Sequence, residues 1–143
     1  MSAKVSVVIP VYNRGDIVSA CVRSVLCQSL SDIEVILVDD GSTDDTLAKM
    51  KGLAKEDSRI RLFSLGENLG APAARNLGMD RARGKYLYFF DSDDYLCRSA
   101  LEVLFDEAER RAVPIVRGGY VRHDPSWVHV YENLTEERRV IDS

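Results

Sequence analysis

The chain has 143 residues and a formal net charge of −4, and 45% of its residues are hydrophobic and 29% charged. A chain of this length can bury roughly 68–70% of its unfolded surface around one core, so we expect a single domain over residues 1–143. The acidic balance offers no basic stripe for a nucleic acid to neutralise, which argues against a nucleic-acid partner. No stretch approaches the ~18 apolar residues of a membrane span, and no secretory signal opens the chain. The sequence therefore favours a cytoplasmic protein, with any attachment to a membrane left to parts outside this chain.

The cysteines fit the same interpretation. Cys21, Cys27 and Cys97 are odd in number and lack the CxxC spacing of a metal or redox site. We expect all three to be buried thiols.

Strands and helices alternate along the chain from its start. A β-branched, apolar run at residues 4–11 is typical of a central strand buried on both faces. Apolar residues then recur at helical spacing, and Asp16 is the predicted N-cap of that helix. A second strand at 33–38 precedes a helix whose predicted caps are the hydroxyls of Ser42 and Thr43.

The same alternation continues through the middle of the chain. The further predicted elements are a strand at 60–65, a helix from near Pro72 to Gly84, a strand at 86–90, a helix with a capping box from Ser99 to Glu102, and a strand at 114–117.

This order predicts the fold class. Strands that alternate with helices form right-handed βαβ units, so we expect a Rossmann-like α/β fold with a mostly parallel sheet and helices on both faces. The βα repeats cover residues 1–117. Residues 118–143 contain a predicted hairpin at 120–131, around Asp124-Pro125, and a polar tail without a core face. The chain is expected to stop before its last layer is complete.

Two of the predicted strands end in acids. Asp39-Asp40 follows the second strand, and Asp91-Ser92-Asp93 follows the strand at 86–90. Ligands of open α/β sheets bind outside the carboxyl ends of the strands, so we expect these acids to share one site. Carboxylates are hard oxygen ligands for Mg²⁺ or Mn²⁺. The alternative interpretation is ordinary turn chemistry, since Asp, Gly and Ser are common in loops.

A third loop, at residues 68–76, combines small residues with a helix start. Free N–H groups at a helix N-terminus suit an anionic phosphate, and Arg75 could add a bidentate donor. An ordinary surface helix start with a solvated arginine explains the segment equally well. The chain has neither a P-loop cradle nor a G-x-G-x-x-G turn after its first strand, which argues against ATPase and dinucleotide sites.

Taken together, four blocks of the sequence resemble the family 2 glycosyltransferases of GT-A fold, over roughly the first two-thirds of the chain. The blocks are Val8–Arg14, Val38–Asp44, Asn68–Gly70 with Ala74–Asn76, and Phe90–Asp94. The resemblance implies a nucleotide-sugar donor, usually a UDP-sugar, a divalent metal (Mn²⁺ or Mg²⁺), and inversion at the anomeric carbon. The acceptor, whether saccharide, lipid or protein, is not specified.

The resemblance also implies roles for individual residues. Pro10 and Tyr12 border the base, Asp40 with Asp39 beside it accepts from the uracil ring nitrogen, Arg75 reaches the base or diphosphate, Asp91 approaches the ribose, and Asp93, paired with Asp91, binds the metal.

The catalytic base is unassigned. Members of this family usually take it from a second half, and Glu132, Glu136 and Glu137 are candidates only in name, because a polar tail with three glutamates is typical of a solvated helix. Two alternatives stay open: a nucleotide-sugar-binding module without catalysis, and a phospho-acceptor receiver domain, which also places acids at parallel-strand ends.

Overall fold

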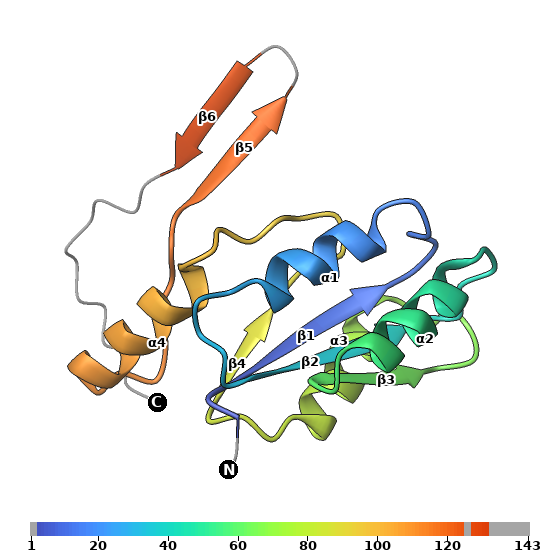
Figure 1. Ribbon diagram of the computed structural model, residues 1–143, viewed down its shortest axis with the longest axis horizontal. Coiled ribbons are helices and arrows are strands. Elements are labelled where there is room, and N and C mark those ends of the chain that lie inside the picture. Colours follow the sequence, from blue (N-terminus) through green and yellow to red (C-terminus); the bar gives the residue numbers. More distant parts are fainter. Residues whose placement is uncertain (1–2, 125–126, 132–143) are drawn as a thin grey trace.

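A computed structural model describes residues 3–124 and 127–131 (Figure 1). Its main sheet is four-stranded and wholly parallel, in the order β3-β2-β1-β4. The strands are β1 (Val5–Val11), β2 (Ile33–Asp39), β3 (Ile60–Ser64) and β4 (Tyr86–Phe89), and the helices are α1 (Val18–Leu26), α2 (Thr46–Glu56), α3 (Ala71–Arg81) and α4 (Ala100–Arg111).

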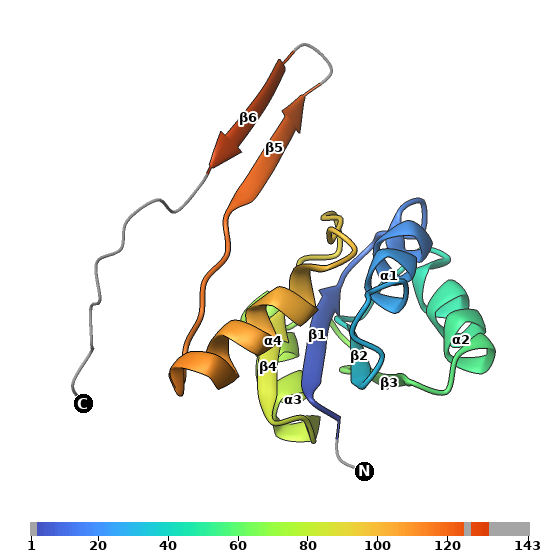
Figure 2. The same cartoon turned by 60° about the vertical axis from the view of Figure 1, so that its left-hand side comes forward.

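Helices cover both faces of this sheet, as the sequence predicts. Side chains of a strand alternate between its faces, and β1 is buried throughout. Val7 and Ile9 lie in a core with α1, α2 and Leu101 of α4, whereas Val8 lies in a second, smaller core with Ala74 of α3. Figure 2 shows the sheet between these layers.

Helix α3 packs closely against the sheet because the residues on its inner face are small. A Cβ atom on Gly78 would overlap the side chain of Val8, and Ala74 on the same face is fully buried. A larger residue at either position would push α3 away from β1. The N-terminus of α3 is thereby held close to the carboxyl ends of the strands.

The strand order separates two of the functional alternatives. β1 lies between β2 and β4, so the first four strands follow the order 3-2-1-4 of Rossmann-like sheets. A receiver domain has the order 2-1-3-4-5, in which the third strand lies beside the first. The receiver-domain alternative is therefore wrong.

Two predicted helix caps are wrong. Asp16 lies outside α1, which starts at Val18, and neither α1 nor α2 has a side-chain cap. The hydroxyl of Ser42 instead accepts the N–H of Asn13 at 3.0 Å, and Thr43 donates its N–H to the Asn13 side chain at 2.8 Å. These polar groups tie two loops together, because both loops leave neighbouring parallel strands at the same edge.

Ser99 is the N-cap residue of α4, but the predicted capping box does not form. Glu102 accepts the hydroxyl of Ser29 at 2.6 Å instead, and the N–H of Leu101 is donated to Gln28 Oε1 at 3.1 Å. The N-terminus of α4 is therefore capped by residues that follow α1.

The predicted strand at 114–117 is also wrong. These residues have no strand structure, and Pro114 to Val116 line an apolar groove with Leu104 and Phe105 of α4. Pro114 has no N–H for strand pairing, and the segment lies against α4 instead of extending the sheet beside β4.

The predicted hairpin is confirmed. β5 (Tyr120–Asp124) and β6 (Trp127–Tyr131) pair antiparallel, and both views show them projecting away from the main sheet (Figures 1 and 2). The predicted turn at Asp124-Pro125 reaches into 125–126, which lie outside the described residues, as does the tail at 132–143 with Glu132, Glu136 and Glu137.

Two smaller observations complete the fold. Cys21 is buried, but Cys27 and Cys97 are exposed, so the expectation of three buried thiols is wrong for two of them. Within the described part of the chain, each helix is too short or too polar to cross a bilayer.

A buried carboxylate holds the end of the sheet opposite the acidic loops. Glu34 on β2 accepts the hydroxyl of Ser6 at 2.6 Å, a guanidinium N–H of Arg61 at 2.8 Å, and the N–H of Arg83. Burial raises the pKa of Glu34, but these hydrogen bonds and the charge of Arg61 outweigh it, so that the net shift of the pKa is downward.

We predict that Glu34→Gln lowers the free energy of unfolding by about 1–3 kcal/mol at pH 7, because it removes the charge from a buried network. A lowered pKa contributes stability above the unfolded pKa that is lost as pH falls through the folded pKa. The difference from wild type should therefore shrink below about pH 4. Urea unfolding at both pH values measures this. Glu56→Gln, which alters an exposed pair with Arg23, is the control and should cost less than about 1 kcal/mol. A larger loss in the control would contradict the assignment.

Candidate functional site

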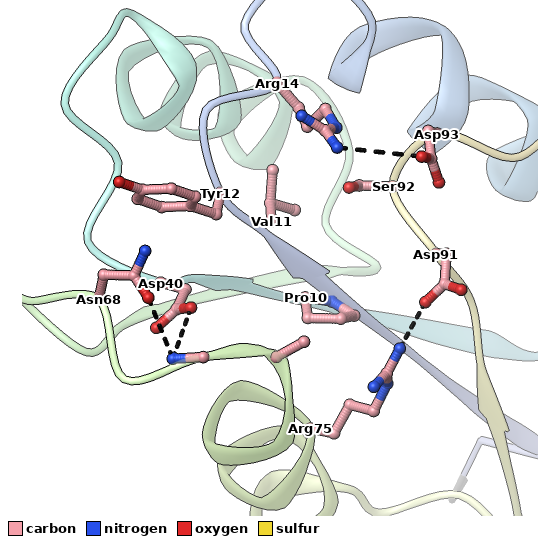
Figure 3. Close-up of a pocket in the computed structure, with 12 residues that line it drawn as sticks. Pro10, Val11, Tyr12, Arg14, Asp40, Asn68, Arg75, Asp91, Ser92 and Asp93 are labelled. Atoms are coloured by element: carbon pink, nitrogen blue, oxygen red, sulfur yellow. Dashed lines mark hydrogen bonds and ion pairs between the residues drawn. The ribbon is translucent and has the colours of Figure 1, made fainter.

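A polar cavity of about 420 Å³ lies at the carboxyl ends of β1, β2 and β4 (Figure 3). This is the edge at which open α/β sheets bind ligands, at the point where the chain crosses from one side of β1 to the other. The lining residues come from four separate segments: Pro10, Val11, Tyr12 and Arg14; Asp40; Asn68, Gly70, Ala71 and Arg75; and Asp91, Ser92 and Asp93.

The end of β1 forms one wall of the cavity. Pro10 and Tyr12 flank Val11, and Tyr12 is 39% exposed, so its ring presents a face to solvent. Asn13 then takes a left-handed backbone conformation with φ of 48°, which turns the chain sharply. The N–H of Arg14 is donated to Thr46 Oγ1 at 2.8 Å. The β1–α1 loop is thereby held against α2, with Tyr12 and Arg14 directed to the cavity.

Asp40 forms the floor on the β2 side. Asp40 is only 3% exposed, and its carboxylate accepts the N–H groups of Leu69 at 2.8 Å and Gly70 at 2.9 Å. These are two of the N–H groups that a phosphate could have bound. Because Asp40 already occupies them, this part of the loop behaves as an ordinary helix start rather than as a phosphate site. Each carboxylate oxygen has a second lone pair, so Asp40 can still accept a hydrogen bond from a ligand.

Asp39 lies outside the lining of the cavity. Its carboxylate is buried and accepts the N–H of Ser42 at 3.2 Å and the hydroxyl of Ser64 at 3.0 Å. Asp39 therefore ties the turn after β2 to the end of β3. The structure gives it an internal role and brings only Asp40 of this pair to the cavity.

The acidic loop after β4 forms the opposite wall. Arg75 Nη2 lies 2.6 Å from Asp91 Oδ1, and Arg14 Nη2 lies 3.9 Å from Asp93 Oδ2. Figure 3 shows both arginines reaching across the cavity toward these acids. Asp91 and Asp93 are each 57% exposed, so both carboxylates have room for further partners.

The acids of this loop repel one another. Burial, followed by the charges of Asp93 and Asp91, raises the pKa of Asp94. Burial and the same three acids raise the pKa of the Cys21 thiol to about 12. The carboxylates of Asp91, Asp93 and Asp94 thus lie near one another, an arrangement that suits a cation.

The residues present fit a divalent cation only in part. Asp91 and Asp93 offer hard oxygen ligands in one cavity, but the described residues contain no cluster of three acidic, histidine or cysteine side chains that could hold a metal alone. Mg²⁺ typically keeps waters and is held by one or two carboxylates plus substrate phosphates. The acidic pair fits that arrangement.

The structure thus brings together nearly all the residues singled out in the sequence. Pro10, Tyr12, Asp40, Arg75, Asp91 and Asp93 line one cavity, and Asp39 does not. Arg14, Asn68 and Ser92 also line the cavity, although the sequence motifs that contain them indicated no individual role for them. Arg14 had a signal, because a cation in the turn directly after a central parallel strand lies at the ligand-binding edge.

A parallel sheet of this order, with a charged cavity at its switch point, defines the Rossmann-like class of nucleotide-binding folds. The family described as "Glycosyl transferase family 2" matches residues 6–141. The chain belongs to this family.

Similar proteins agree with that assignment. Glycosyltransferase GlyG of Streptococcus pneumoniae serotype 4 is 36% identical over 135 residues, which cover 94% of this chain and 45% of GlyG. The crystal structure of S. aureus TarS 1–349 in complex with UDP-GlcNAc is similar with a TM-score of 0.71 and 29% identity, over 76% of this chain and 32% of the TarS 1–349 chain. A mannosyltransferase from Pyrobaculum calidifontis, in complex with GDP-Man and Mn²⁺, has the same fold, with a TM-score of 0.68 and 24% identity, over 83% of this chain and 35% of that protein.

These neighbours confirm the GT-A type of fold. The chain spans less than half the length of GlyG and about a third of each solved structure.

We predict that Gly41→Ala destabilises the wall of the cavity. Gly41 has φ of 69°, and a Cβ atom there would overlap the backbone of Glu67 and Asn68. Left-handed strain and this overlap together should cost about 2–5 kcal/mol of unfolding free energy. Gly66→Ala is the matched control, because Gly66 has φ of 80° but open space around it, and should cost only about 1–2 kcal/mol. Denaturant unfolding compares them, and equal losses would show that the contact with Asn68 is unimportant.

Proposed function

We propose that this chain binds the donor of a metal-dependent, inverting glycosyltransferase, and that the donor is a UDP-sugar. One observation carries the proposal: the acids after β2 and β4 meet in a single cavity that also contains two arginines. Solved complexes of a similar protein support it, since TarS 1–349 has been solved with UDP and with UDP-GlcNAc.

The β1–β2 side of the cavity suits a base. Tyr12 offers an aromatic face, Pro10 offers an apolar edge, and Asp40 offers a buried carboxylate acceptor. A uracil ring presents one N–H between two carbonyls, so a carboxylate acceptor is its complement. Asp40 is already fixed by two backbone N–H groups, which means that little ordering is needed when the base binds.

The β4 side suits a diphosphate. Without a ligand, Arg75 forms an ion pair with Asp91, and Arg14 forms one with Asp93. A diphosphate offers both arginines a more highly charged acceptor. The acids released in this way need a new positive partner. We assign Asp93, with Asp91, as the ligands of Mn²⁺ or Mg²⁺, and Asp91 also as the neighbour of the ribose.

This assignment accounts for the departure of the nucleoside diphosphate but not for activation of the acceptor. When sugar is transferred, the leaving nucleoside diphosphate gathers negative charge, and a divalent cation bound by the acidic pair would neutralise part of it. Arg75 and Arg14 orient the diphosphate and share that charge. The base that deprotonates the acceptor is unassigned among the described residues. The alternative of a binding module that does not transfer sugar by itself rests on this observation.

We predict that UDP raises the stability of the protein and that Mn²⁺ enlarges the effect. At a hundredfold excess over Kd, binding to the folded state alone adds about 2.7 kcal/mol. Thermal shift with UDP, GDP, ATP and uridine, each with and without Mn²⁺, measures this. Equal shifts for all nucleotides, or no effect of the metal on UDP, would reject the donor or the metal part of the proposal.

We predict that the two acidic strand ends act on different parts of the ligand. Asp93→Asn should weaken UDP roughly tenfold or more with Mn²⁺ present and leave uridine unchanged, because it removes a metal ligand. Asp40→Asn should weaken uridine by about 1.5–3 kcal/mol even without metal, because it removes a charged acceptor.

Calorimetry with both ligands tests this pair. Asp80→Asn, on an exposed position of α3, is the matched control and should change neither affinity. Indistinguishable losses for both ligands in the two site variants would sink the assignment of roles.

A further inference from the structure

The acidic loop has few anchors of its own. Between the end of β4 and the start of α4, residues 90–99 form no helix or strand. At its start, the N–H of Phe90 is donated to the carbonyl of Val8 in the sheet at 3.0 Å, and the carbonyl of Asp91 accepts the Cys21 thiol of α1 at 3.7 Å and the N–H of Asp94 at 3.1 Å. Beyond Asp94, the backbone of the loop is held by hydrogen bonds to residues outside the sheet.

Those contacts come from the end of α1 and the residues after it. Ser24 Oγ accepts the N–H of Leu96 at 3.2 Å. Gln28 donates Nε2–H to the carbonyl of Cys97 at 2.8 Å, and Ser29 donates its N–H to the carbonyl of Arg98 at 2.8 Å. We call Ser24, Gln28 and Ser29 the α1 clamp.

Gln28 is the centre of this clamp. Its side chain is 6% exposed, and its carboxamide is used at both ends. Nε2–H reaches Cys97 and the carbonyl of Ser24, while Oε1 accepts the N–H of Leu101 in the first turn of α4. One buried side chain thus holds α1, the end of the acidic loop and the start of α4 together.

The position of this clamp matters for the acids. Leu96 is three residues beyond Asp93, so six residues, 90–95, lie between the end of β4 at Phe89 and the clamped residue Leu96. Asp91, Asp93 and Asp94 are like charges within four residues of chain, so their repulsion favours spreading of the loop beyond its contacts with Cys21 and Arg75 at Asp91. A fixed end at Leu96 opposes that spreading.

We propose that Gln28 is a positioning residue for the donor site: its carboxamide fixes the acidic loop so that Asp91 and Asp93 face the diphosphate side of the cavity. This inference rests on the proposed function. It assigns to the residue two positions after α1 a part in metal and diphosphate binding, although Gln28 lines no part of the cavity. Partners that orient metal ligands typically change metal affinity 10–100-fold when they are replaced, so the effect is measurable.

The test compares Gln28→Met and Ser24→Ala with wild type. Methionine is unbranched and of similar length but cannot donate to Cys97 or accept from Leu101. We expect Gln28→Met to raise the Kd of UDP with Mn²⁺ roughly 10–100-fold and to change the Kd of uridine without metal by less than about twofold. Ser24→Ala, the milder change, should act in the same direction. Hydrogen exchange at the Leu96 and Leu101 amides should rise in the variants that remove their acceptors.

A role in stability alone would give a different result. Glu34→Gln perturbs a buried polar network at the opposite end of the sheet and is the control for a general loss of stability. It should leave the Kd of UDP with Mn²⁺ unchanged at a temperature where both variants are folded. An equal rise of Kd in Glu34→Gln would overturn the positioning role.

A double-mutant cycle with Asp93→Asn gives the sharpest outcome. If Gln28 acts through the acidic loop, Gln28→Met should add little to the loss already caused by Asp93→Asn. Additive losses would overturn the proposal. Wild-type protein that bound no UDP would instead overturn the proposed function, whereas wild-type binding with an unchanged Kd in Gln28→Met and Ser24→Ala would overturn the clamp alone.

Discussion

The parallel pairing of β1 with both β2 and β4 is the constraint on which the rest of the structure depends. Val11 lies opposite Asp39 in one ladder and Val8 opposite Phe89 in the other, so the three strands end near one another. Each strand continues directly into a polar segment at that edge. The cavity exists because the loops after these three strands leave the sheet at the same place, beside the start of α3.

Charge is balanced across the cavity rather than within any one loop. The acids after β4 are adjacent in sequence and repel one another, and their arginine partners come from the β1–α1 loop and from α3. The four side chains of these two ion pairs are all partly exposed, so their partners can be exchanged. A diphosphate with a cation presents the same two signs of charge, so it can replace the internal pairs without leaving a buried charge unpaired.

Polar side chains that usually cap helices serve here as ties between loops. Ser42 and Thr43 hold Asn13, and Gln28 takes the place of a local cap at α4. Asp40 holds the start of α3 through Leu69 and Gly70. Each tie joins segments more than 25 residues apart in the chain. The geometry of the cavity is therefore a property of the whole fold, and changes outside its lining can alter binding.

The sequence by itself determined the order of strands and helices. The apolar runs at 4–11, 33–38 and 86–90 indicate buried strands whatever their distant partners are, because they reflect only the burial of local side chains. It also determined which strand ends are acidic, and four motif blocks indicated the family. Only the tertiary structure decided that Asp40 faces the cavity while Asp39 turns inward, that Arg14 joins the site, and that 114–117 does not extend the sheet. These outcomes depend on partners distant in the chain, since a hydroxyl or carboxylate with several possible partners is committed only when folding brings one within hydrogen-bonding distance.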